Sequence, residues 1–352
     1  MNKIKSDILI IGAGPTGLFA VFEAGLLGLK CHLIDALPKP GGQCTELYPK
    51  KPIFDIPGTP EILAGKLVEN LMEQIKPFDP GYTLSESADE LIKNDDGSFD
   101  VITNRGTVHN SKVVAIAGGL GSFEPRKPSI ENISNYEGNG VEFMIKDPSI
   151  FHDKNVVISG GGDSALDWTI ELQKIARRIT LIHRRSEFRG AFDSVEKVQK
   201  LKNKGLVNVI TPAEVVGLNG LQALDSLVIK QNNNYIDYKT DYFVPLFGLT
   251  PKLGKLQDWG LNIEKNSILV NNSLDYQTNI PGIFAIGDIN TYPGKLKLIL
   301  CGFHEATLMC QAAFKIIHPT KKNILKYTTV TGIDGFDGSK KKSQSAIVKS
   351  IT

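Results

Sequence analysis

The feature that most limits how this chain can fold is the glycine pattern Gly12, Gly14 and Gly17. It follows a β-branched run at residues 7–11, opens a helical pattern, and is followed by a second apolar strand that ends in Asp35. Glycines at this spacing let the backbone turn tightly and approach a pyrophosphate at a helix N-terminus, and the acid accepts a hydrogen bond from a ribose hydroxyl. The opening residues therefore predict a Rossmann-type dinucleotide site with contacts at Gly12, Gly14, Gly17 and Asp35.

A second strand, glycine turn and helix lie about 150 residues later, by count along the sequence. The pattern G-x-G-x-x-A follows an apolar strand at residues 156–159 and opens a helix predicted over residues 163–176. Its candidate contacts are Gly160, Gly162, Asp163 and Ser164. The chain is therefore expected to bind two dinucleotides.

The two units differ at the end of their second strand. The first ends in Asp35, whereas the second ends in His183, Arg184 and Arg185. Arginine supplies forked, permanently charged donors that favour a ribose 2′-phosphate, and an acid repels that phosphate. The second site is expected to prefer NADP over NAD, and the pairing that makes redox sense is FAD in the first unit and NADPH in the second.

Size and charge exclude several classes of protein. The chain has 352 residues, 41% of them hydrophobic, which is enough for two domains with buried cores. Its 40 Lys and Arg against 38 Asp and Glu give no strong field for holding nucleic acid or an anionic membrane. The glycines interrupt the first apolar stretch, and no later run reaches the length that a membrane helix requires, so a cytoplasmic protein is expected.

The four cysteines, Cys31, Cys44, Cys301 and Cys310, form neither a C-x-x-C pair nor a zinc-ligand spacing. A disulfide scaffold and a metal site are both disfavoured. A lone buried cysteine is usually a small packing residue, and Cys44 is expected to be one.

Glycine-rich breaks suggest where the domains meet. We expect hinges at residues 118–121 and 247–249, which assign residues 1–117 and 249–352 to one domain and residues 118–248 to another. Within the first domain the pattern predicts an ordered loop over residues 38–60, a helix over residues 61–75 and a strand over residues 83–91. Asp288, in Ala285-Ile286-Gly287-Asp288, offers a carboxylate near a helix entry, where it could bind a cofactor or cap the helix.

Taken in order, these motifs resemble those of the thioredoxin reductase-like flavoproteins over nearly the whole chain. Within that group the sequence is most similar to the type 2 ferredoxin-NADP reductases, through Gly41-Gly42-Gln43-Cys44 with Tyr48, through the segment from Gly160 to Trp168, and through Tyr327-Thr328-Thr329.

The resemblance implies an α/β fold of two Rossmann-like domains of the three-layer ββα type, with the NADPH domain inserted into the FAD domain. It implies FAD contacts at Thr16, Asp35, Gln43, Tyr48, Ala88, Phe123, Asp288 and Thr329. It also implies a homodimer and two domains that rotate about the hinges.

The sequence departs from thioredoxin reductase itself, which passes electrons through a C-x-x-C pair in its NADPH domain. Residues 118–249 contain no cysteine here, so hydride arriving on the flavin must leave as electrons to an external acceptor. The expected activity is that of a ferredoxin–NADP+ reductase, with ferredoxin or flavodoxin as partner. The flavin is the centre of this chemistry, and no side chain is assigned as acid-base catalyst.

Two other interpretations stay open. One is an NADPH-dependent flavoprotein reductase of a small acceptor, such as a quinone or a ferric chelate, or of a separate disulfide protein. The other is a flavin-binding redox sensor with little turnover, which the His183-Arg184-Arg185 set argues against because a sensor has less need of NADPH specificity.

Overall fold

The structure is a computed structural model that describes residues 3–121, 124–250, 252–271 and 273–322, together with residues 328, 332 and 333. By its internal contacts the chain divides into two compact units. Unit 1 comprises Met1–Ser122 and Pro251–Thr352, and unit 2 comprises Phe123–Thr250. Unit 1 is therefore built from two separate stretches of sequence, with unit 2 inserted between them.

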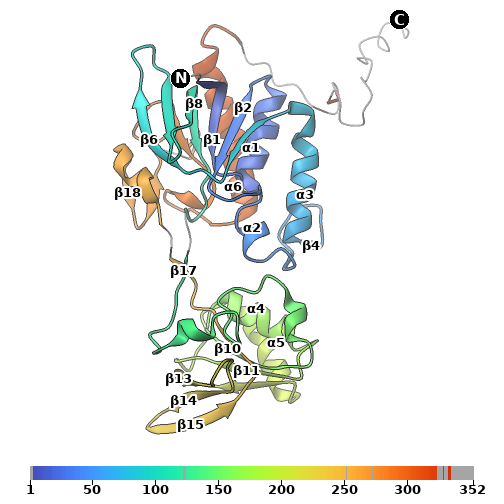
Figure 1. Cartoon of the computed structure of the whole chain (residues 1–352). Helices are drawn as coiled ribbons and strands as arrows, with labels where there is room; N and C mark the ends of the chain where they lie inside the picture. The colour runs from blue at the N-terminus through green and yellow to red at the C-terminus, as the bar shows by residue number, and fades with distance from the viewer. Residues whose placement is uncertain are drawn as a thin grey trace, which may run out of the picture. The chain divides into compact units, whose positions relative to one another are not determined.

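The core of unit 1 is a seven-stranded sheet in the order β5-β2-β1-β8-β7-β6, with β20 also paired to β8 (Figure 1). Its strands are β1 (Ile4–Ile11), β2 (Cys31–Asp35), β5 (Gly81–Leu84), β6 (Ala88–Lys93), β7 (Phe99–Thr103), β8 (Val108–Ile116) and β20 (Ile283–Ala285). Pairing is parallel from β5 through β8 and on to β20, and antiparallel in the β6-β7-β8 meander. The first half of β8 pairs with β7 and its last residues pair with β20. This one long strand therefore joins the antiparallel meander to the parallel part of the sheet.

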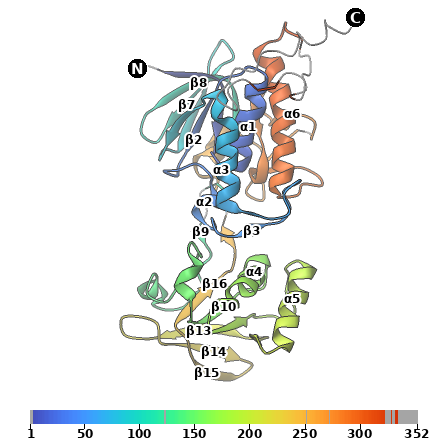
Figure 2. The ribbon, with the colours of Figure 1, turned by 90° about the vertical axis from the view of Figure 1, so that its right-hand side faces the viewer.

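Three helices pack together on one side of these strands (Figure 2). They are α1 (Pro15–Leu26), α3 (Ala64–Ile75) and α6 (Ile299–Ile317), and α1 contacts both of the others. Helix α1 begins with proline, whose fixed φ suits the first helical position and whose missing N–H has no partner to lose there.

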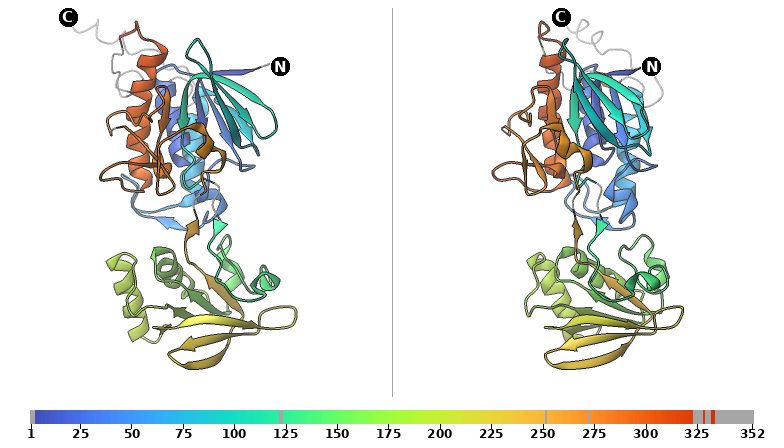
Figure 3. Two further views of the ribbon diagram at one scale, coloured as in Figure 1. Left: turned by 90° about the vertical axis from the view of Figure 1, so that its left-hand side faces the viewer. Right: turned by 60° about the vertical axis from the view of Figure 1, so that its left-hand side comes forward.

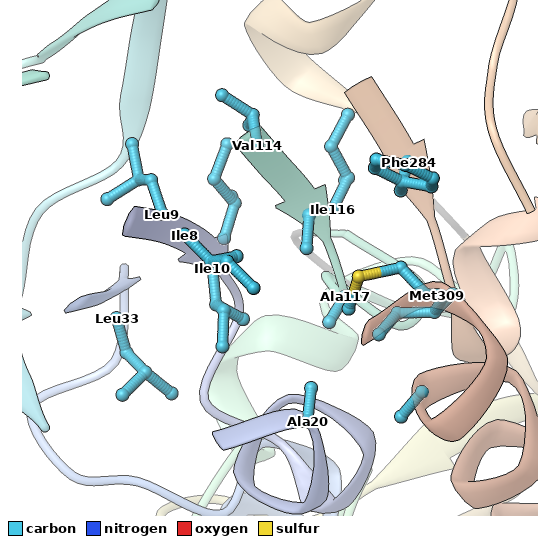
Figure 4. Close-up of a cluster of buried hydrophobic side chains, with 14 of the residues drawn as sticks. Ile8, Leu9, Ile10, Ala20, Leu33, Val114, Ile116, Ala117, Phe284 and Met309 are labelled. Atoms are coloured by element: carbon cyan, nitrogen blue, oxygen red, sulfur yellow. The ribbon is translucent and has the colours of Figure 1, made fainter. Parts of the chain in front are cut away.

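Apolar side chains of β1, β2, β8 and β20 form the core of unit 1, together with residues of α1 and α6 (Figure 4). The side chains drawn there include Ile8, Leu9, Ile10, Ala20, Leu33, Val114, Ile116, Phe284 and Met309, each fully buried. Such β-branched runs are typical of parallel strands that are covered on both faces.

Short elements complete unit 1. They are α2 (Gln43–Glu46), the β3 (Pro52–Ile53) and β4 (Ile62–Leu63) pair, the sheet of β18 (Ile263–Glu264), β19 (Ser267–Leu269) and β21 (Asn290–Thr291), and the 3-10 turns η1 (Lys76–Phe78), η4 (Gly254–Trp259) and η5 (Gly287–Ile289).

Unit 2 has a four-stranded parallel sheet in the order β12-β11-β10-β16 and a three-stranded antiparallel sheet (Figure 3). Its elements are β10 (Asn155–Ser159), α4 (Asp163–Leu172), β11 (Arg178–Ile182), α5 (Phe192–Asn203), β12 (Val207–Ile210), β13 (Glu214–Asn219), β14 (Ser226–Gln231), β15 (Asn234–Lys239) and β16 (Tyr242–Pro245), with the 3-10 turns η2 (Ile133–Tyr136) and η3 (Pro148–Phe151). Phe243, Leu227 and Ile229 are fully buried in the core that joins the two sheets.

The segments that connect the units are paired strands. β9 (Glu124–Pro125) pairs with β17 (Leu249–Thr250), and the amide of Arg126 donates to the Gly248 carbonyl over 3.0 Å. On the unit 1 side, the amide of Lys252 donates to the Leu120 carbonyl over 3.1 Å. The hinges expected at residues 118–121 and 247–249 fall in or beside these connections, and rotation about them stays a prediction.

Three local predictions were wrong in part. The helix expected over residues 61–75 begins at Ala64, because Ile62–Leu63 pairs with β3. The strand expected over residues 83–91 is two strands, β5 and β6, separated at Ser85, whose φ of 59° breaks an extended chain. The loop expected over residues 38–60 contains α2 and β3. In the part of the chain that the structure describes, no helix is both long and apolar enough to cross a membrane.

Candidate functional site

The first glycine turn is closed on one side and open on the other. A Cβ atom on Gly12, whose φ is +109°, would fall 2.4 Å from the Ala117 carbonyl oxygen, and one on Gly17 would fall 2.0 Å from the Gly12 carbonyl oxygen. A Cβ on Gly14 would have no described atom beyond its chain neighbours within 4 Å. Gly14 is the N-cap of α1 and offers no side-chain cap, so the free N–H groups of the helix face this open space. The turn is thus shaped to admit an anion.

Asp35 is fixed to this turn by both of its carboxylate oxygens. Oδ2 accepts from the Ala13 amide over 2.6 Å and Oδ1 accepts from the Leu37 amide over 2.8 Å. Burial raises the pKa of Asp35, and these two amide hydrogen bonds oppose the shift. Each oxygen keeps a further lone pair that can accept from a hydroxyl group.

Two residues before Ala88, the chain is hydrogen-bonded to Asp35 at the end of β2. The amide of Glu86 donates to the Asp35 carbonyl over 3.1 Å, and Ala88 then begins β6 as a buried residue. The backbone two residues before Ala88 is therefore joined to the end of β2, and the FAD contact at Ala88 stays a prediction.

Thr16 joins the glycine turn to the second half of unit 1. Its hydroxyl oxygen lies 2.9 Å from the place of a Cβ on Gly287 and 2.2 Å from that on Gly302. Both glycines leave room for this side chain, so the start of α1 packs directly against η5 and α6.

The Gly41-Gly42-Gln43 segment also lies on the glycine turn. The Gly41 amide donates to the Ala13 carbonyl over 2.8 Å, and a Cβ on Gly42 would lie 3.2 Å from Gly14 Cα. Gln43 begins α2, and its Nε2 atom lies 3.5 Å from the place of a Cβ on Gly119. This segment therefore packs directly against the backbone of the glycine turn.

Tyr48, Cys44 and Asp288 form a cluster. The Tyr48 hydroxyl hydrogen-bonds to the Cys44 sulfur. Burial raises the pKa of Cys44 to about 11, and the Asp288 charge adds to that shift. Burial, followed by the Cys44 and Asp288 charges, also raises the pKa of Tyr48. Cys44 and Asp288 are 244 residues apart in the sequence, so only the tertiary fold brings them near each other.

The helix-cap interpretation of Asp288 was wrong. The residue lies in η5, and α6 begins only at Ile299, with its cap at Leu298. Burial raises the pKa of Asp288, while Lys295 and Lys297 oppose the shift. No hydrogen bond or ion pair within the described part of the chain uses its carboxylate. The Asp288 carboxylate is therefore a half-buried acceptor that lacks a donor among the residues that the structure describes.

Sequence reasoning missed a buried ionic network beside Asp288. Glu305 of α6 is 1% exposed, and its carboxylate accepts hydrogen bonds from four groups. The donors are the Gly287 amide at 2.6 Å, Asn290 Nδ2 at 2.9 Å, the Tyr292 hydroxyl at 2.9 Å and Lys295 Nζ. The signal that could have shown this was the apolar stripe of residues 302, 306, 309 and 313, on which Glu305 falls at helical spacing.

Two of the expected contacts, Phe123 and Thr329, lie outside the described residues, as does Tyr327. In the ranges that are described, no group of three or more His, Cys, Asp or Glu side chains could hold a metal ion.

The second glycine turn, in unit 2, has the same form as the first. A Cβ on Gly162 would meet no described atom beyond its neighbours within 4 Å, and Gly162 is the N-cap of α4 without a side-chain cap. Ser164 and Asp163 are exposed in the first turn of that helix. Asp163 Oδ1 accepts from the Ala191 amide over 2.6 Å, which ties the turn to the segment after β11. The expected residues are therefore brought together around one open helix N-terminus.

The three residues after β11 have different surroundings. His183 is 5% exposed and stacks on Phe188, with ring centroids 5.3 Å apart. Burial lowers the pKa of His183, and the neighbouring arginines add to the shift. Arg184 and Arg185 are exposed, and neither forms an ion pair with any residue that the structure describes. The arginines are thus available to bind an anion, whereas the His183 ring is buried against Gly161 and Phe188.

Comparisons with known proteins agree with this geometry. The family model described as pyridine nucleotide-disulphide oxidoreductase matches residues 6–306. The chain is 68% identical to a ferredoxin–NADP reductase of Flavobacterium johnsoniae and 52% identical to one of a Bradyrhizobium species. The matches cover 99% of both chains in the first case, and 93% of this chain and 96% of the relative in the second.

Solved structures share the fold. The thioredoxin reductase of Lactococcus lactis matches with a TM-score of 0.76 and 24% identity, over 89% of this chain and 99% of its own. The thioredoxin reductase of T. acidophilum matches with a TM-score of 0.77 and 21% identity, over the same shares of the two chains. These likenesses confirm the expected two-domain α/β fold.

Proposed function

This chain belongs to the pyridine nucleotide-disulphide oxidoreductase family and, within it, to the ferredoxin–NADP reductases, and on that premise we propose that it passes electrons between NADPH and ferredoxin through FAD. The observation that carries the proposal is the contrast between its two glycine turns. One ends beside the carboxylate of Asp35, and the other ends beside the free cations of Arg184 and Arg185. Each charge suits a different dinucleotide.

The residues of unit 1 fit FAD. The open space at Gly14 and the free N–H groups of α1 would hold the pyrophosphate, and Asp35 would accept from a ribose hydroxyl. The Asp288 carboxylate, which lacks a protein donor in the described chain, would accept from the ribityl hydroxyls. Gln43, at the start of α2, and Tyr48, just beyond its end, would contact the ring.

The residues of unit 2 fit NADPH. Gly160, Gly162 and Ser164 at the start of α4 would bind the pyrophosphate, and Arg184 and Arg185 would bind the 2′-phosphate. His183 would support these contacts from beneath, because its ring fills the space under the Gly161 backbone.

The chemistry of the bound flavin is to accept a hydride and to release electrons one at a time. The chain itself supplies no dithiol to relay them, since residues 118–249 contain no cysteine and all four cysteines are free. The acceptor therefore has to be an external molecule, which suits ferredoxin. Within this proposal we include flavodoxin as a second acceptor, a homodimer, rotation of the units about the hinges and a place in the cytoplasm.

The test is to follow reduction of cytochrome c by the purified protein with NADPH, with and without added ferredoxin. NADH serves as the control for nucleotide preference, and the flavin spectrum reports cofactor binding. We expect strong dependence on ferredoxin and clear preference for NADPH. If NADPH bleaches the flavin but ferredoxin adds nothing to turnover, the cofactor assignments stand and ferredoxin is not the acceptor.

A further inference from the structure

A buried ion pair lies next to the turn that carries Asp288, and nothing in the proposed chemistry uses it. The side chains of Lys295 and Glu305 are 5% and 1% exposed. Taking two charges out of water is costly, and a buried pair of this kind adds little stability compared with apolar residues of the same size. The position of the pair beside Asp288 suggests a role other than stability.

The two oxygens of Glu305 contact different groups. Oε2 accepts from the Gly287 amide and from Asn290 Nδ2, which are the residues on either side of the Asp288 turn. Oε1 accepts from the Tyr292 hydroxyl and from Lys295 Nζ. One carboxylate therefore fixes the backbone around Asp288 and also holds the ammonium group of Lys295 in place.

Asn290 is a second sign that this turn is held rigidly. It is fully buried, its Nδ2 donates both to Glu305 and to the Ala285 carbonyl at 2.8 Å, and its Oδ1 has no partner within the described chain. The chain on both sides of Asp288 is thereby held, and the Asp288 carboxylate has no hydrogen-bond partner among the described residues.

We propose that Lys295 and Glu305 are positioning residues that hold Asp288 toward the flavin and, through their two buried charges, set the reduction potential of that flavin. The inference rests on the proposed binding of FAD at Asp288. The physical reason is that reduction adds negative charge to the flavin, and in a region of low dielectric a nearby cation favours that charge while a nearby anion opposes it.

Removing the charge of Lys295 and removing that of Glu305 should shift the flavin potential in opposite directions. Lys295→Met leaves Glu305 negative and uncompensated, which disfavours the reduced flavin and lowers its potential. Glu305→Gln leaves Lys295 positive, which favours the reduced flavin and raises its potential. In the double variant neither charge remains, so its potential returns toward that of the unchanged protein. A purely structural role would move both single variants in the same direction.

Lys297 provides the matched control. It is exposed, it also acts electrostatically on Asp288, and its Nζ lies 3.3 Å from Ser267 Oγ. Lys297→Met also removes one positive charge from the segment between β21 and α6. Because water and salt screen an exposed charge, its shift is smaller than that of Lys295→Met and disappears at high ionic strength.

The experiment is an equilibrium dye titration of the flavin potential in the four variants and the unchanged holoprotein, at low and high salt. We expect opposite shifts for Lys295→Met and Glu305→Gln. Each corresponds to about a tenfold change in the ratio of affinities for reduced and oxidised flavin, or about 30 mV for a two-electron couple. Shifts of the same sign in the two single variants, or no shift in either, would overturn the inference. A double variant whose potential differs from that of the unchanged protein as much as the single variants do would also overturn it.

A separate measurement of FAD binding distinguishes failure of the proposed FAD site from failure of the inference about the potential. Asp288→Asn should weaken FAD binding to the apoprotein, measured by flavin fluorescence. If FAD affinity is unchanged in that variant, the assignment of Asp288 falls, and the inference falls with it. If FAD affinity drops but the two charge variants shift the potential alike, only the inference is wrong. If one single variant does not fold, the sign of the shift in the other, together with the return of the double variant toward the unchanged protein, still tests the inference.

Discussion

The backbone of Gly161 lies against the ring of His183 so closely that a Cβ atom at position 161 would fall 2.2 Å from His183 Cε1. Real Cβ atoms do not approach that closely, so Gly161→Ala must displace either the turn or a ring that is itself buried. Such overpacking costs about 1–3 kcal/mol. We expect lower thermal stability of unit 2 and NADPH binding weakened at least about tenfold, with FAD content unchanged. Calorimetry and NADPH titration of the holoprotein measure both effects.

Gly162→Ala, one position further on, separates folding from binding. A Cβ there meets no described atom beyond the chain neighbours within 4 Å, and φ is −101°, which alanine adopts freely. We expect stability to change by less than about 0.5 kcal/mol, while NADPH binding falls because the new methyl group fills the open space at the helix N-terminus. Unchanged NADPH binding in Gly162→Ala would place the pyrophosphate elsewhere.

The cysteines give a prediction about thiol reactivity. Cys31, Cys44 and Cys310 are buried and Cys301 is half-buried. Burial raises the pKa of Cys44 to about 11, so at pH 8 only about a thousandth of it is thiolate, against about a quarter for an ordinary thiol of pKa ~8.5. We expect a thiol reagent to label one cysteine rapidly in the native protein and four after denaturation.

Cys301→Ser is the control for that measurement, because it should remove the rapid phase entirely. Labelling of Cys44 at the rate of Cys301 would contradict the structure and would reopen a redox role for this thiol.

The parts of the site that the sequence predicted are those with local causes. Gly12 and Gly160 mark turns because only glycine allows the close contacts seen there. Asp35 is the last residue of β2 and Arg184 comes just after β11, and both positions were found by counting along the sequence. Neither inference depends on tertiary contacts, so both could be made from the sequence alone.

Glu305 and His183 show why the rest could not be predicted. Glu305 owes its role to donors from residues 287–295, which reach it only when η5 packs on α6. His183 was expected in the binding set along with the two arginines, but the strand end turns its ring under Gly161 while Arg184 and Arg185 point to solvent. These placements depend on tertiary packing, which periodicity does not determine.

Two buried histidines in unit 1 predict a loss of stability in acid. His109 is fully buried, its ring centroid lies 4.7 Å from that of His32, and neither of its ring nitrogens has a partner in the described chain. Burial lowers the pKa of His109 to about 4, and the charge of His32 adds to the shift. Because the unfolded chain takes up this proton near pH 6.5, it binds more protons than the folded chain between about pH 6.5 and pH 4.

Stability should therefore fall as the pH is lowered through that range, by at most about 3 kcal/mol from His109. Denaturant unfolding from pH 7 to pH 4.5 measures this slope. His109→Gln should flatten it, whereas His152→Gln, at an exposed position, should leave it unchanged. Equal slopes in His109→Gln and the unchanged protein would show that His109 does not resist protonation.

The last prediction concerns nucleotide choice. Arg184 and Arg185 are exposed and form no ion pair among the described residues, so they can hold a 2′-phosphate without breaking another contact. A hydrogen bond to a charged group contributes about 1.5–3 kcal/mol, so each Arg→Ala variant should lower kcat/KM for NADPH about ten- to hundredfold. The value for NADH, which lacks the phosphate, should barely change. Arg178, exposed at the opposite end of β11, is the matched control, and Arg178→Ala should keep the NADPH preference. If the arginine variants lose activity with NADH to the same degree, these side chains maintain the fold of the site rather than recognise the phosphate.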